Sequence, residues 1–177
     1  MKIFRLDCDV TNFQSFASGD EGMLKRLPGG CRPVPSPWVP PVVYVYDLLL
    51  KAADFSRFWF ALVASPRAMR AVGEIIQPCC ELLPLPVEDG RMFTVANVLA
   101  CVDCLDHARS KVTTNVLKNN YVFLPDRVPD AAIFRTPEDT VVETFVVERT
   151  GDPKTEFKAA VEQHGLTGLI FWQVWEG

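Results

Sequence analysis

The chain has 177 residues, 49% of them hydrophobic and 11% aromatic, and a formal net charge of −4 at pH 7. This length and composition suit one domain with its own hydrophobic core, and they exclude a chain that is disordered throughout. Basic side chains form no run or stripe, which argues against nucleic acid as a partner, and no apolar run reaches the ~18 residues of a membrane span.

The acidic excess lies in the second half of the chain. Residues 1–100 balance their basic and acidic side chains, and residues 101–177 carry the whole excess. Such a half can steer a basic protein partner. A solvated acidic surface that maintains solubility explains the same charge.

The compartment is predicted from the N-terminus and the cysteines. Residues 1–7 lack the continuous apolar segment of a secretory signal. A core of this size does not require disulfides, so the six cysteines fit free thiols. We expect a cytoplasmic protein if Met1 is the true start.

The first elements are a strand and a long connector. Lys2–Val10 predicts a strand, and residues 28–41 hold six prolines, which is typical of an extended segment. We expect a structural loop that Trp38 holds in place, and a docking motif for domains with aromatic grooves is the alternative.

Three elements are expected after this loop. Val42–Tyr46 is β-prone, Asp47–Ala53 predicts a short helix, and Arg57–Ala64 predicts a strand.

Residues 66–77 predict a helix with a marked start. Ser65 stands before a proline that suits the first helical position. Met69, Val72 and Ile76 then recur at helical spacing.

A hairpin is expected after this helix. Cys80–Glu88 predicts a strand, which Pro84 and Pro86 place at an edge or a bulge. Asp89-Gly90 then predicts a turn into a strand over Met92–Ala96.

The last stretch has the clearest pattern: strands over Ala131–Arg135 and Val141–Glu148, a helix over Pro153–His164, and a strand over Leu169–Trp175. Asp152 is expected to cap the start of the helix and Gly165 its end. The final strand is apolar on both faces. It is therefore either central and covered on both sides, or it offers one aromatic face to a partner.

The elements predict an α+β fold with a mixed, mainly antiparallel sheet and two or three helices. Strand, helix and strand recur at 57–88 and 143–176, either as a degenerate duplication or by chance. We expect a single domain over 1–177, with residues 1–55 as an N-terminal extension and residues 56–177 as the core.

The candidate chemistry is sparse. Cys101, Cys104 and His107 are spaced like part of a zinc site, but a structural site needs four ligands, and buried thiols are the simpler interpretation. Asp103 and Asp106 could form an acid–base pair in a cleft, or serve turns and caps. We predict no catalytic residues, no metal and no cofactor.

Short hydrophobic patterns carry a resemblance to a known family. They are Asn97-Val98-Leu99, Val102 to Asp106, Ser110, Ile133-Phe134-Arg135, Thr144 to Glu148, Phe157-Lys158, Val161-Glu162 and Gly165 to Leu169. In these residues the chain resembles the eleventh numbered family of bacterial polymorphic-toxin immunity proteins, over roughly residues 56–177. It departs from the family pattern at 111–120 and 149–152.

The resemblance implies a cytoplasmic protein that binds and neutralises a cognate toxin domain without chemistry of its own. We expect part of the interface at Glu138, Asp139, Glu143 and Glu148. Two alternatives stay open. One is an enzyme with dispersed residues such as Asp103, Asp106 and His107, and the other is a self-associating module that uses Trp172 and Trp175.

Overall fold

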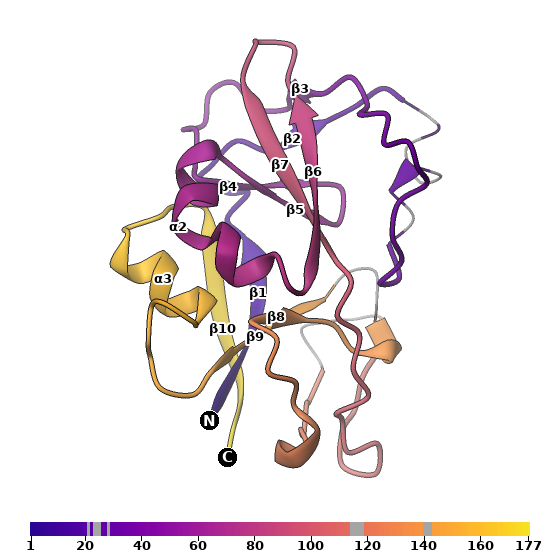
Figure 1. Ribbon diagram of the computed structural model, residues 1–177, viewed down its shortest axis with the longest axis vertical. Helices are drawn as coiled ribbons and strands as arrows, with labels where there is room; N and C mark the ends of the chain where they lie inside the picture. The colour runs from indigo at the N-terminus through magenta and orange to yellow at the C-terminus, as the bar shows by residue number, and fades with distance from the viewer. Residues whose placement is uncertain (21, 23–25, 28, 114–118, 140–142) are drawn as a thin grey trace.

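The computed structural model describes the chain except for residues 21, 23–25, 28, 114–118 and 140–142 (Figure 1). Its strands are β1 (Lys2–Cys8), β2 (Phe16–Ala17), β3 (Tyr44–Val45), β4 (Phe55–Phe58), β5 (Ala61–Ala64), β6 (Cys80–Pro86), β7 (Met92–Val98), β8 (Ile133–Phe134), β9 (Thr144–Glu148) and β10 (Leu169–Glu176). Its helices are α2 (Pro66–Ile76), α3 (Phe157–Gln163) and the short 3-10 turns η2 (Pro125–Arg127) and η3 (Pro137–Asp139). Within the described residues, no helix is long and apolar enough to cross a membrane.

The strands form two sheets. Four strands run in the order β10-β1-β9-β8, and six run in the order β3-β2-β4-β5-β7-β6. Neighbouring strands are antiparallel except β2 and β4, which are parallel. The predicted α+β class with a mixed, mainly antiparallel arrangement is confirmed.

One arrangement of strands and helix occurs twice. In the first unit β4-β5-α2-β6-β7 the sheet order is β4-β5-β7-β6, so β7 lies between the two strands that flank the helix. In the second unit β8-β9-α3-β10 the order is β8-β9-β1-β10, and β1 takes the equivalent place. The two ends of the chain meet, since the Met1 amino group donates to the Gly177 carbonyl (2.8 Å). The predicted strand–helix–strand units are thus both present, and each holds an antiparallel strand at its centre.

The hydrophobic core has three parts. α2 and α3 lie side by side (Figure 1) and share the largest cluster with β-strands of both sheets, around Phe55, Val146 and Phe157. The segment before β4 covers the other face of the six-stranded sheet, through Phe16 and Val43. The segment between β7 and β8 covers the other face of the four-stranded sheet.

Asp54 joins the two units. Its carboxylate accepts hydrogen bonds from Arg67 Nη1 (2.6 Å), Thr167 N (3.0 Å) and Thr167 Oγ1 (3.1 Å). Next to it, Phe55 N donates to Thr167 O (2.9 Å). Gly168 has φ +97, and a Cβ placed there would lie 2.1 Å from the carbonyl oxygen of Phe55. Only glycine allows the two chains to approach this closely.

Several predicted elements are confirmed. α2 begins after Ser65, whose side chain accepts from Ala68 N (3.1 Å), and it buries Val72 and Ile76. β6 lies at a sheet edge as its prolines predict, and the turn at Asp89-Gly90 leads into β7. Trp38 Nε1 donates to Pro84 O (2.9 Å), as expected for a loop that this indole holds in place.

Two predictions between residues 47 and 64 are wrong. Residues 47–53 form no helix, because the Asp47 carboxylate accepts from Leu49 N (3.1 Å) and closes a turn instead. Residues 57–64 are not one strand. The chain reverses at Trp59 and Phe60 into the β4–β5 hairpin, and Trp59 has φ +56.

α3 begins at Phe157, so its predicted start at Pro153 is also wrong. Asp152 closes only one turn, accepting from Lys154 N (2.9 Å), and Glu156 is extended. The Glu156 carboxylate instead accepts from the backbone N–H groups of Arg149 (3.0 Å), Thr150 (2.7 Å) and Gly151 (2.8 Å). Gly165 ends the helix region with φ +55, as predicted.

Of the two alternatives for the last strand, the central position covered on both sides is wrong. β10 is an edge strand that pairs with β1. Phe171 packs on Phe157 and Trp175 on Phe123, whereas Trp172 is 50% exposed. The N-terminal strand takes the central place, which the pattern of the C-terminal stretch alone cannot reveal.

The close approach at Gly168 predicts a large effect of a single methyl group. We expect Gly168→Ala to destabilise the fold by roughly 4 kcal/mol or more, because the Cβ meets backbone that cannot move aside. Gly90→Ala is the matched control, since Gly90 has φ +87 with nothing within 4 Å, and it should cost about 1 kcal/mol. Urea unfolding measures both, and equal losses would contradict the contact.

Glu156 predicts an acid-sensitive loop before α3. Burial raises the pKa of its carboxyl, but the N–H donors of Thr150, Gly151 and Arg149 outweigh burial and hold the pKa below its usual value. Its stabilising effect is therefore complete above the unfolded-state pKa and is lost as pH falls through the lower folded-state pKa.

We expect Glu156→Gln to lose about 1 kcal/mol of stability at pH 7, and the difference from wild type to shrink below pH ~4. Unfolding curves from pH 3 to pH 8 measure this. A difference that stays constant over this range would argue against a role for the ionised carboxylate.

Candidate functional site

The four acidic positions expected at an interface lie in different surroundings. Glu143 is 2% exposed and Glu138 lies at the surface in η3. Glu148 ends β9 and pairs with Lys158 (3.0 Å). Asp139 has its backbone in η3, and its side chain lies outside the described part of the chain. Glu143 and Glu148 stand at opposite ends of β9, so the structure does not bring all four together.

Glu143 belongs to a buried polar cluster. Its carboxylate accepts a hydrogen bond from the Tyr121 hydroxyl, and Arg5 Nη1 lies 3.9 Å from its Oε1. Burial and the hydrogen bond to Glu143 raise the pKa of Tyr121, so the phenol stays protonated and donates. Glu143 therefore has a structural role in addition to the interface role predicted for it.

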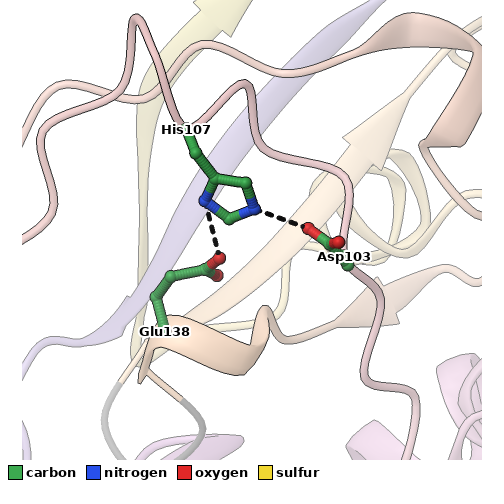
Figure 2. A group of neighbouring side chains, drawn as sticks. All are labelled: Asp103, His107 and Glu138. Carbon is green, nitrogen blue, oxygen red and sulfur yellow. Dashed lines mark hydrogen bonds and ion pairs between the residues drawn. The ribbon is translucent and has the colours of Figure 1, made fainter.

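Asp103, His107 and Glu138 form a cluster at the surface (Figure 2). His107 Nε2 lies 2.9 Å from Asp103 Oδ1, and His107 Nδ1 lies 3.3 Å from Glu138 Oε1. Each carboxylate thus contacts a different nitrogen of one ring. A cation could be held by one ring nitrogen and a carboxylate, but the mutual ion pairs already account for the arrangement.

The other members of the candidate motif lie elsewhere. Cys104 is buried beneath the four-stranded sheet, where burial raises the pKa of its thiol to about 12, and Cys101 is exposed. Asp106 accepts from Ala108 N (3.0 Å) and Arg109 Nε (2.6 Å), and the hydrogen bond to Arg109 lowers its pKa. The turn and capping role of Asp106 is confirmed.

A hollow of about 290 Å³ opens between the end of β3 and the β4–β5 turn. It is lined by Val10, Ser15, Phe16, Tyr46, Asp47, Arg57 and Trp59. Two of its lining aromatics are exposed, Tyr46 at 72% and Trp59 at 47%. Next to Tyr46 along the chain, Leu48 and Leu49 are 78% and 97% exposed.

A second hollow of about 130 Å³ lies where β1 meets the β4–β5 hairpin. Its charged lining residues are Arg5, Asp7, Arg57 and Glu143. Arg57 lines both hollows. Trp172, which is 50% exposed, stands opposite Arg5 in the β1–β10 pair.

The sequence patterns do not reveal the first hollow. They predict a helix over Asp47–Ala53 and place Trp59 inside a strand, so they do not indicate that side chains from the two segments are exposed close together. No signal for this hairpin is present, because residues 59 and 60 are Trp and Phe, and no turn residue separates 55–58 from 61–64.

Comparison with known proteins gives one family. The sequence model of the immunity protein family Imm11 matches residues 88–176. The match therefore spans half of the chain, from the β6–β7 turn through β10. A search of curated proteins finds no match.

The buried Glu143 cluster predicts a stability effect that must be separated from binding. We expect Glu143→Ala to cost roughly 3 kcal/mol, because it leaves Tyr121 and Arg5 without this buried partner. Glu148→Ala, which breaks a more exposed pair, should cost about 1 kcal/mol or less. Thermal unfolding of both variants tests this, and similar losses would contradict the role of burial.

Proposed function

The chain belongs to the Imm11 immunity protein family, and on this premise we propose that it binds a cognate bacterial toxin domain and blocks it by direct contact. The family match over residues 88–176 carries the proposal. We propose that the protein binds the toxin in the cytoplasm of the cell that it protects.

Neutralisation of this kind requires a preorganised surface and no catalysis. The hollow at Tyr46 and Trp59 supports this, since tyrosine, tryptophan and arginine are enriched at the energetic centres of protein interfaces.

The alternative function, an enzyme with dispersed catalytic residues, would depend on Asp103, Asp106 and His107. Asp106 is engaged with Arg109 in a turn, and Asp103 and His107 pair at the surface. Because neither hollow described above includes these residues, we propose a protein that acts by binding.

Self-association is the second alternative. Trp175 packs inside the fold, so an oligomer would use Trp172 and the edge of β10. A molecular mass that rises with concentration and falls with Trp172→Ala would favour this use of the strand.

The direct test is protection in living cells. We expect expression of the toxin domain encoded beside this gene to stop bacterial growth, co-expression with this chain to restore it, and the two purified proteins to elute as one complex. Growth arrest that persists with the chain folded and present would refute the proposal.

The acidic positions are proposed to steer the toxin, with Glu138 the informative one because it lies at the surface. We expect Glu138→Lys to slow association several-fold at low salt and less at high salt. Asp126→Lys makes the same charge change at an exposed residue outside the proposed positions. Stopped-flow association rates that are equal for the two variants would remove Glu138 from the interface.

A further inference from the structure

Five of the ten large exposed apolar side chains among the described residues line the first hollow or follow its lining residues in the sequence. Val10, Tyr46, Leu48, Leu49 and Trp59, here called the aromatic surface, are between 45% and 97% exposed. Three of them line the same hollow, and the two leucines follow Asp47, which lines it as well. Single exposed apolar residues are common, whereas a continuous patch marks an interaction site.

The backbone beneath this surface is held in place. Gln14 N donates to Lys51 O (2.9 Å), Gln14 Nε2 donates to Leu50 O (2.9 Å), and Tyr46 N donates to Ser15 O (2.9 Å). The turn that exposes the two leucines is therefore tied to the segment before β2. A surface that is ordered before binding loses less entropy when a partner docks.

Trp59 occupies a costly conformation. It is the first of two residues in the β4–β5 turn and has φ +56, where glycine is the usual residue of such hairpins. A bulky side chain there costs about 1–2 kcal/mol relative to glycine. Strained residues of this kind cluster at binding sites, so the conformation of Trp59 supports a functional role for it.

Arg57 is the basic residue of the first hollow, which Asp47 also lines. It lies between the two hollows, and its Nε donates to Trp59 O. No ion pair joins Arg57 to a carboxylate within the described residues. A carboxylate from a partner would complete this site and would leave the aromatic residues to contact apolar atoms around it.

We infer that the toxin domain docks on the aromatic surface, with an acidic side chain placed beside Arg57 and apolar side chains against Tyr46, Leu49 and Trp59. The inference rests on the proposed function and names the surface that performs it.

The test compares binding of the purified toxin domain, encoded beside this gene, to wild type and variants by calorimetry. Trp59→Gly removes the indole and relieves the backbone strain, so we expect little net change in thermal stability and a loss of affinity of about tenfold or more. Arg57→Glu should lower affinity by a similar factor. Met92→Ala and Arg70→Glu are matched controls at exposed positions on β7 and α2, and they should bind as wild type does.

The outcomes separate the inference from the proposed function. If wild type binds and both surface variants bind within twofold of it, the inference is overturned and the proposed function stands. If wild type does not bind the toxin domain, both fall. If Trp59→Gly converts a wild-type dimer to a monomer without changing toxin affinity, the surface serves a second copy of the chain, and the inference is again wrong.

Discussion

The contact between residues 53–55 and 167–168 is the constraint on which the rest of the structure depends. Asp54 accepts hydrogen bonds from Arg67 at the start of α2 and from Thr167 at the start of β10. Gly168 has no Cβ, and this lets the two backbones approach within hydrogen-bonding distance. One carboxylate and one glycine thus fix how the two strand–helix units meet, and with them where the β4–β5 hairpin lies relative to β1.

The second unit is completed by the first strand of the chain. β1 lies between β9 and β10, as β7 lies between β5 and β6. The hollows at the meeting point therefore combine residues from distant segments: Val10 follows β1, Tyr46 follows β3, and Arg57 and Trp59 come from the hairpin. The family match covers β7 and the second unit without β1, so the aromatic surface lies outside the matched residues.

The sequence predicts those elements that local chemistry determines. Ser65 and Pro66 mark α2, Gly90 marks the turn before β7, and the prolines of β6 place it at an edge. The sequence does not predict those elements whose structure depends on a distant or unusual interaction. No local pattern shows that the Glu156 carboxylate accepts from the backbone at 149–151, so that α3 begins later than predicted. No local pattern shows that β1 lies between β9 and β10 and leaves β10 at the edge. The same holds for Trp59, which occupies a turn position where glycine is usual. The helix predicted over residues 47–53, which include the exposed leucines, is wrong because the Asp47 carboxylate closes a turn there in place of the helix that leucine favours.

We propose that this protein neutralises its partner by contact through the aromatic surface. Hydrogen–deuterium exchange of the whole chain, with and without the purified toxin domain, tests this contact. We expect slower exchange at residues 44–51 and 56–60 in the complex, with little change in α2. Protection confined to α2 and α3, or exchange that the toxin domain leaves unchanged throughout, would contradict it.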